Sequence, residues 1–477
     1  MELLKFITCG SVDDGKSTLI GHILYDSKLL YADQEQALIL ESKVGSISGE
    51  IDYSLLLDGL MAEREQKITI DVAYRYFTTD KRSFIVADTP GHEEYTRNMA
   101  VGASFADLAV ILIDASKGVI SQTKRHMRIC DLMGIKHFVF AVNKMDLIGY
   151  EESKFRLISS DINDLVKEID VKSSAIIPVS ATKGDNITLK SRNIHWYNGK
   201  TLLDYLETIE IYDEEEKGFY MPVQRVCRPN HSFRGFQGQI ESGSISVGDV
   251  ITAYPSGENA VVSSIFIGNK QMDKAFYGQP ITMQLDREVD VSRGCVISKE
   301  LDIRGVSEIS VSLLWMDDNE LIKGNDYWLK IGTRLVPAVI KDIYYKLDIN
   351  SGKRIKTNTI KKNEIASCEI VLVEKVVADE FTAHRALGEF IIIDRITHST
   401  AACGRVDSIS EDKCKDKRLY PDDFDIPVGS QYLFVRNGKV IGYGEHEKDI
   451  PIYELGSDKS FTLMCLWNNA EKLEYEI

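Results

Sequence analysis

The chain contains 477 residues, of which 44% are hydrophobic and 27% are charged, and its formal net charge is −16. This length predicts roughly two to four domains, and the composition excludes a largely disordered chain. The negative net charge disfavours nucleic acid as a partner, because proteins bind phosphates through Lys and Arg. A local basic patch could still exist, since net charge does not describe how charges are distributed.

The N-terminal segment and the cysteines predict a cytoplasmic protein. Met1–Cys9 lacks the basic region and cleavage site of a signal peptide, and no apolar run reaches the roughly 18 residues that a membrane-spanning helix needs. The cysteines are scattered, with no Cys-x-x-Cys pair, which favours free thiols over disulfides or a metal site. They are Cys9, Cys130, Cys227, Cys295, Cys368, Cys403, Cys414 and Cys465.

Residues 1–212 alternate between short apolar runs and helical patterns. Runs of this kind are typical of strands that are covered on both faces, so we expect an α/β domain with a mostly parallel sheet. Val72–Thr78 alternates less cleanly and fits an edge strand. The predicted buried strands are Leu3–Cys9, Ser83–Ala87, Leu108–Ile113, Phe138–Val142 and Ala175–Val179.

The sequence pattern changes after an acidic linker at residues 213–218. Short β-rich runs with regularly spaced turn signals follow, which favours antiparallel β-barrels. We expect one barrel at residues 219–305 and another at 306–410, and then a solvated connector at 410–418.

Residues 419–477 form a last segment of unknown role, for which we hypothesise a small β-rich extension. Arg436-Asn437-Gly438-Lys439 predicts the turn of a hairpin between Tyr432–Val435 and Val440–Tyr443.

A phosphate-binding loop directly follows the first predicted strand. The segment from Gly10 to Ser17 fits G-x-x-x-x-G-K-[ST], and its glycines let backbone N–H groups wrap phosphates at a helix N-terminus. Lys16 would neutralise the β- and γ-phosphates and the Ser17 hydroxyl would bind Mg²⁺, whereas the alternative is a chance glycine loop. The nucleotide-binding residues predicted here are Gly10, Asp13, Asp14, Gly15, Lys16, Ser17 and Thr18.

Three more motifs each follow a predicted strand, and their order makes a GTP site the best interpretation. In Asp88-Thr89-Pro90-Gly91-His92, a carboxylate reaches Mg²⁺ through water and Gly91 offers a backbone N–H to the γ-phosphate. In Asn143-Lys144-Met145-Asp146, a carboxylate suits the two donors of guanine, which adenine lacks. Ser180-Ala181-Thr182-Lys183 offers backbone N–H groups to the guanine oxygen.

Two other motifs are interpreted as structural. Gly199-Lys200-Thr201 looks like the end of a second phosphate loop, but its leading position is Ile194, so we expect a turn before a helix at Leu202–Leu206. The basic run Lys124–Arg128 would suit RNA or a partner, but a solvated helix face is the expected explanation.

These motifs resemble those of the translation-factor superfamily of GTPases, in which a GTPase domain precedes two β-barrels. Within that superfamily, several stretches resemble the GTPase subunit family of sulfate adenylyltransferase, and the similarity extends to about residue 404. The stretches are Ile51–Leu60, Glu63–Phe77, Tyr95–Met99, His195–Gly199, Met221–Gln224, Arg234–Phe236, Ser292–Gly294 and Phe390–Arg395.

The resemblance implies roles for individual residues. Thr69 would join Ser17 and Asp88 as a Mg²⁺ ligand in the GTP-bound switch, and it would act with Lys16 in catalysis. His92 would orient the attacking water, the alternative being a solvated loop histidine.

The residue types at two positions, 14 and 67, can be compared with those of the related families. Asp14 agrees with the sulfate-activating family, whereas elongation factors usually carry His there. Lys67 departs from the family's Gly, which leaves the behaviour of this switch open.

The function implied by the resemblance is that of one subunit of a heterodimer. GTP hydrolysis on this chain would drive the conversion of ATP and sulfate to adenosine 5′-phosphosulfate and pyrophosphate on a small catalytic subunit. The alternatives are a ribosome-associated translation factor, which shares the architecture, and a GTP-regulated scaffold.

Overall fold

The computed structural model describes residues 3–26, 53, 69–211, 218–230, 233–301 and 303–409, and the backbone of short strands between 418 and 476. Residues 51–52, 54–60, 63–68, 213–217 and 410–417 lie outside the described residues, and with them most of the first switch, Lys67, the acidic linker and the connector. The chain forms two compact units, residues 1–305 with 309–408 and residues 306–308 with 409–477.

The first domain is built on a six-stranded sheet with the order β2-β3-β1-β4-β5-β6. All neighbouring strands are parallel except β2, which pairs antiparallel with β3 at the edge. This confirms the predicted α/β fold and the predicted edge strand. The strands are β1 (Leu3–Cys9), β2 (Ala73–Thr78), β3 (Ser83–Asp88), β4 (Leu108–Asp114), β5 (His137–Asn143) and β6 (Ser173–Pro178).

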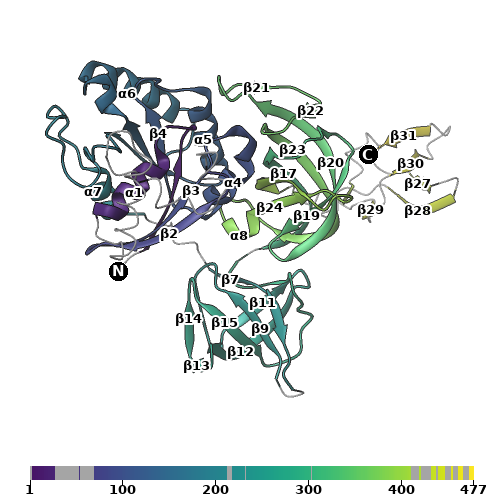
Figure 1. Ribbon diagram of the computed structural model, residues 1–477. Helices are drawn as coiled ribbons and strands as arrows, with labels where there is room; N and C mark the ends of the chain where they lie inside the picture. The colour runs from purple at the N-terminus through teal and green to yellow at the C-terminus, as the bar shows by residue number, and fades with distance from the viewer. Residues whose placement is uncertain are drawn as a thin grey trace. The chain divides into compact units, whose positions relative to one another are not determined.

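Helices cover both faces of this sheet (Figure 1). Successive side chains of a strand point to opposite faces, and β4 is buried at all seven positions. Its Ile111 packs with α4, α5 and α6, while its neighbour Leu112 packs with α1 and α7. These helices are α1 (Lys16–Asp26), α4 (Thr96–Phe105), α5 (Ser121–Leu132), α6 (Glu152–Val166) and α7 (Leu202–Thr208).

The parallel order gathers the polar motifs at one edge of the sheet. Because β3, β1, β4 and β5 run in the same direction, their carboxyl ends lie together. Gly10, Asp88 and Asn143 stand at three of these ends. Open α/β sheets bind ligands at this edge, so the sheet topology alone brings motifs distant in sequence to one place.

An antiparallel eight-stranded sheet follows, with the order β7-β16-β11-β12-β15-β9-β8 and β13 paired to β12. It surrounds a core that includes Phe219, Phe236 and Ile265. β10 (Ser244–Ser246) and β14 (Lys274–Phe276) form a separate two-stranded sheet, whose Ile245 and Ala275 join the same core. The eight strands are β7 (Phe219–Pro222), β8 (Arg225–Cys227), β9 (Gly235–Gln239), β11 (Val250–Tyr254), β12 (Glu258–Ile267), β13 (Lys270–Met272), β15 (Pro280–Leu285) and β16 (Val296–Lys299).

The next sheet closes into an antiparallel barrel. Its order is β19-β24-β25-β17-β23-β20-β21, and β19 also pairs with β20, which completes the ring. The strands are β17 (Arg304–Trp315), β19 (Asp326–Ile331), β20 (Arg334–Leu347), β21 (Arg354–Ile355), β23 (Ile365–Ala378), β24 (Glu389–Ile393) and β25 (Thr400–Ile409). The shorter elements of this region are β18 (Leu321–Ile322), β22 (Thr359–Ile360) and α8 (Arg385–Gly388).

The C-terminal strands form small antiparallel sheets of their own. β27 (Gln431–Arg436) pairs with β28 (Lys439–Glu445), and Arg436 lies opposite Lys439, which confirms the predicted hairpin. The four-stranded sheet has the order β28-β27-β30-β31. Its other strands are β30 (Ser460–Cys465) and β31 (Lys472–Glu476), while β26 (Arg418–Leu419) pairs with β29 (Tyr453–Glu454).

The expectation for the basic run on α5 is wrong. Arg128 is only 4% exposed; its Nε donates to the carbonyl of Ile349 at 3.1 Å, and its guanidinium pairs with Glu168. His126 is only 2% exposed. Arg128 is held by segments distant in sequence and His126 by Gln122 of the same helix, so the run is a packed polar face and not a solvated one.

The second structural expectation is confirmed. Thr201 caps α7, since its side chain accepts a hydrogen bond from the backbone N–H of Asp204, so the Gly199-Lys200-Thr201 motif is a turn before a helix. The six cysteines that the structure describes are free thiols. Across the described residues, no helix combines the length and apolar character that a membrane crossing requires.

Candidate functional site

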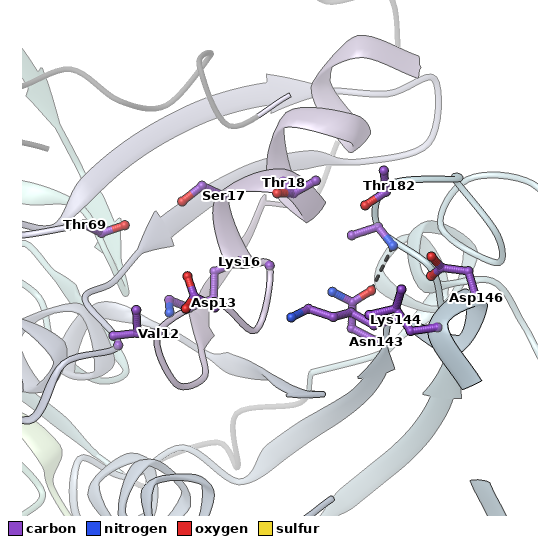
Figure 2. A pocket seen from close by; sticks show the side chains of 14 residues that line it. Val12, Asp13, Lys16, Ser17, Thr18, Thr69, Asn143, Lys144, Asp146 and Thr182 are labelled. Atoms are coloured by element: carbon purple, nitrogen blue, oxygen red, sulfur yellow. Dashed lines mark hydrogen bonds between the residues drawn. The ribbon is translucent and has the colours of Figure 1, made fainter. Parts of the chain in front are cut away.

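A cavity of 410 Å³ opens at the carboxyl edge of the first sheet (Figure 2). It is lined by the loops that follow β1, β3, β5 and β6 and by Thr69. Most of the residues predicted to bind nucleotide therefore meet in one space. The lining residues are Val12, Asp13, Gly15, Lys16, Ser17, Thr18, Thr69, Gly91, Asn143, Lys144, Asp146, Leu147, Ala181 and Thr182.

The phosphate loop after β1 depends on the absence of a side chain at Gly15. Its φ is +90°, and an added Cβ would lie 2.6 Å from Asn143 Nδ2. The Lys16 ammonium is buried and donates to the carbonyls of Gly10 and Ser11, at 3.0 and 2.9 Å. Burial lowers the pKa of Lys16, an effect that the carboxylates of Asp88 and Asp14 oppose. The buried ammonium of Lys16 is therefore stabilised by further negative charge beside it, which phosphate oxygens would supply.

Asp88, at the end of β3, is buried beside the phosphate loop. It is 1% exposed and accepts hydrogen bonds from Ser17 Oγ and Thr8 Oγ1, each at 2.9 Å. Burial raises the pKa of Asp88, and the positive charge of Lys16 is the largest of the effects that lower it. A nearby divalent cation would offset the cost of that buried carboxylate.

The oxygen groups near Asp88 fit a hard cation such as Mg²⁺. Ser17 and Thr69 both contribute hydroxyls to the cavity wall. Among the described residues no three His, Cys, Asp or Glu side chains gather as a metal cluster. Mg²⁺ in nucleotide sites is held by one or two protein oxygens together with substrate phosphates, and this set matches that pattern.

Asn143, at the end of β5, joins two loops of the site. Its Nδ2 donates to the carbonyl of Asp14 at 2.7 Å, and its Oδ1 accepts from the N–H of Ala181 at 2.8 Å. The next residue, Lys144, has a φ of +61°, and its ammonium pairs with Asp114 at 2.9 Å. The phosphate loop and the loop after β6 are therefore braced against the same side chain.

Asp146 and Thr182 lie at the end of the cavity opposite Ser17 and Thr69 (Figure 2). Asp146 Oδ1 accepts a hydrogen bond from Ser180 Oγ at 2.7 Å, which holds the carboxylate against the loop after β6. One end thus carries groups suited to phosphates and a cation, and the other carries a carboxylate suited to a base with two donors.

His92 is exposed and does not line the cavity. It caps the short helix η2 (Glu93–Tyr95), and its Nδ1 accepts from the N–H of Glu94 at 3.2 Å. The preceding Gly91 does reach the wall, where an added Cβ would lie 2.5 Å from Lys16 Nζ. The role of His92 in orienting water stays a prediction.

Some predicted residues support the cavity without lining it. Asp14 Oδ2 accepts from the N–H of Ser11 at 2.6 Å, and burial raises the pKa of the Asp14 carboxyl. Gly10 and Ser180 likewise act on lining residues, through Lys16 and Asp146.

The sequence interpretation missed three residues. Val12 and Leu147 line the cavity, and buried Asp114 anchors Lys144. Asp114 ends an apolar strand in the same way as Asp88, so its position was a usable signal.

Comparisons with known proteins agree with this geometry. The model of the Elongation factor Tu GTP binding domain matches residues 1–212, and that of the GTP-eEF1A C-terminal domain-like family matches residues 308–407. "Sulfate adenylyltransferase subunit 1" of Aliarcobacter butzleri is 49% identical over 88% of this chain and 91% of its own length. The protein of the same name from Francisella tularensis subsp. novicida is 48% identical over 89% of this chain and 90% of its own. The "Bifunctional enzyme CysN/CysC" of Xylella fastidiosa is 48% identical over 85% of this chain and 66% of its own length.

Proposed function

We propose that this chain, which belongs to the sulfate adenylyltransferase subunit 1 family and is a GTPase, hydrolyses GTP to drive adenylyl transfer from ATP to sulfate on a second subunit. The products of that transfer are adenosine 5′-phosphosulfate and pyrophosphate. The second subunit is a small catalytic protein that binds ATP and sulfate, and the two chains form a heterodimer.

The polarity of the cavity carries the GTP part of this proposal, and the similarity to sulfate adenylyltransferase subunit 1 carries the rest. Lys16 and Ser17 lie at the phosphate end, and Asp146 stands at the other end beside Ser180. A nucleoside triphosphate placed along this axis sets its base against a carboxylate, which accepts from the N1–H and 2-amino groups of guanine. Adenine lacks that pair of donors, so the site is suited to GTP.

The residues then take distinct parts in hydrolysis. Lys16 binds the β- and γ-phosphates, while the hydroxyls of Ser17 and Thr69, with Asp88 behind them, hold Mg²⁺. When bound, Mg²⁺ supplies neutralisation of the phosphate charge. His92 orients the attacking water once its loop closes on GTP, and loss of the γ-phosphate releases Thr69 and Gly91.

A contact beyond the GTPase domain supports coupling. The carbonyl of Glu93, two residues after Gly91, accepts hydrogen bonds from Thr96 Oγ1 at 2.6 Å and from Asn363 Nδ2 at 3.0 Å. Asn363 precedes β23 of the closed barrel. A movement of the segment after Gly91 therefore changes a bond to the barrel, which offers a route from hydrolysis to the rest of the chain.

The test is the GTPase rate of the purified chain, alone and with the small catalytic subunit, ATP and sulfate, with ribosomes as a separate addition. We expect stimulation by the small subunit and its substrates, with adenosine 5′-phosphosulfate formed in proportion to GTP hydrolysed. The variant Lys16→Ala should lose both activities. Stimulation by ribosomes alone would refute the proposal and support a translation factor.

A further inference from the structure

Two polar side chains of α5, those of Gln122 and Arg125, contact the segment that begins at Gly91, and His126 contacts Gln122. Gln122 Nε2 donates to the carbonyl of Gly91 at 3.3 Å and lies 3.0 Å from Nε2 of His126. Arg125 Nη1 donates to Gln122 Oε1 at 3.0 Å and pairs with the carboxylate of Glu93 at 2.9 Å. None of these α5 side chains lines the nucleotide cavity, so none of them is assigned a role by the proposed function.

The protons of this network are fixed by counting donors. The Gln122 amide has two N–H groups, of which one serves the carbonyl of Gly91, so the other meets His126 Nε2 as an acceptor. With this amide orientation His126 is neutral and carries its proton on Nδ1, which is buried and has no hydrogen-bond partner among the described residues. Burial, together with the positive charges of Lys16 and Arg125, lowers the pKa of His126 to about 3, in agreement with that state.

Every hydrogen-bonding group of Gln122 in this network has a partner, which selects one orientation of its amide. If the amide were flipped, its oxygen would face the Gly91 carbonyl and its nitrogen would face the guanidinium of Arg125. The Gly91 carbonyl and Arg125 thus determine which side of Gln122 donates to the Gly91 segment, and His126 Nε2 accepts the second amide N–H.

The group that Gln122 holds is a single rigid unit. The carbonyl of Gly91 and the N–H of His92 belong to the same planar peptide, in which the two bonds point in opposite directions. A hydrogen bond that draws the carbonyl towards α5 therefore turns the His92 N–H away from α5. The same hydrogen bond restricts the position of the His92 backbone and the position of Gly91 beside the Lys16 ammonium.

We propose that Gln122 is a positioning residue for GTP hydrolysis, which holds the Gly91–His92 peptide in the orientation that catalysis needs, and that Arg125 acts through it by fixing the amide. The inference rests on the proposed assignment of Gly91 and His92 to the γ-phosphate and the attacking water. It adds a support on α5 that the sequence motifs of the site do not include.

The test compares two substitutions that remove the donor in different ways. Gln122→Met has nearly the same length but no polar group, and Gln122→Glu keeps an acceptor for Arg125 but has no N–H for Gly91 or His126. We expect kcat for GTP to fall about 10- to 100-fold in both, since a small misplacement of a reacting group costs up to about that factor. KM for GTP and Kd for GDP should stay within about twofold, because Gln122 touches neither.

A second readout distinguishes positioning from a general loss of packing. The imidazole nitrogens of His126, observed by ¹⁵N NMR, should show the Nδ1–H tautomer in the unmodified chain. In Gln122→Glu the carboxylate accepts from Nε2, so the signal should change to the Nε2–H form. Ser121→Ala, at an exposed position one residue earlier on α5, is the matched control and should leave kcat and the tautomer unchanged.

The outcomes separate this inference from the proposed function. Unchanged kcat in both Gln122 variants, with activity lost in Lys16→Ala and His92→Ala, overturns the inference and leaves the function standing. A parallel loss of GDP affinity and kcat also overturns it, since Gln122 would then serve binding. Full activity in Lys16→Ala and His92→Ala would instead remove the proposed site. If Gln122→Met does not fold, Gln122→Glu and the tautomer decide.

Discussion

Replacing Asp146 by Asn should change the preferred base from guanine to xanthine. The carboxylate offers acceptors to two donors of guanine, and hydrogen bonds to a charged group contribute about 1.5–3 kcal/mol each. Asp146 is half-buried, so solvent screening favours the lower value, and the loss of both bonds amounts to about 3 kcal/mol. GTP affinity should therefore fall about 100-fold, at 1.4 kcal/mol for each factor of ten.

The structure indicates that this substitution leaves the loop intact. Asp146 Oδ1 accepts from Ser180 Oγ at 2.7 Å, and the amide oxygen of an Asn can accept the same bond. Its amide nitrogen then faces the base, where it repels the donors of guanine but suits the additional carbonyl of xanthine. Xanthosine triphosphate should thus bind the variant more tightly than GTP.

The assay is the Kd of GTP, xanthosine triphosphate and ATP, measured by calorimetry for the unmodified chain and for Asp146→Asn. Ser180→Ala is the matched control, because it loosens the carboxylate without changing its chemistry; it should weaken GTP by less than about tenfold and keep the preference for guanine. An unchanged ratio of GTP to xanthosine triphosphate affinity in Asp146→Asn would refute the assignment of this end of the cavity to the base.

Three further predictions concern the same domain. Asn143→Ala leaves two buried backbone groups without partners, so urea unfolding should show a loss of about 2–4 kcal/mol in the free energy of unfolding. Gly91→Ala places a Cβ 2.5 Å from Lys16 Nζ and should lower kcat for GTP at least about tenfold, measured as phosphate release, while GDP still binds. The pKa of His126 lies near 3, whereas an unfolded His titrates near 6.5, so the unfolded chain binds more protons between these values and stability falls as the pH drops below 6.5. Unfolding at pH 5.5 and 8 should show about 1.4 kcal/mol lost from this source, and His126→Phe should remove that contribution.

The strands and the site motifs were predictable because their signals are local. β1 matches the predicted Leu3–Cys9, and the predicted runs Ser83–Ala87 and Phe138–Val142 lie within β3 and β5. In a parallel sheet these boundaries determine which residues stand at the carboxyl edge. Asp88 and Asn143 therefore followed from strand prediction together with motif order.

The polar face of α5 was not predictable, because its partners are distant in the sequence. Arg128 bonds to Ile349 and pairs with Glu168, and Gln122 bonds to Gly91. A helix rich in Lys, Arg and His has the pattern of a solvated surface unless carbonyls and carboxylates from elsewhere meet it. His92 shows the converse limit, since its motif predicts a function but not whether its ring points into the cavity.

The charges around Lys16 predict that GTP and a divalent cation would bind cooperatively. The buried ammonium lies among the carboxylates of Asp88 and Asp14, and burial raises the pKa of both carboxyls. Among the described residues, Asp14 Oδ1 has no hydrogen-bond partner. A triphosphate that binds without a divalent cation is repelled by the carboxylate of Asp88. A divalent cation that binds without the triphosphate is repelled by the ammonium of Lys16. Each ligand offsets the charge that opposes the other, and by linkage each must raise the affinity of the other by the same factor.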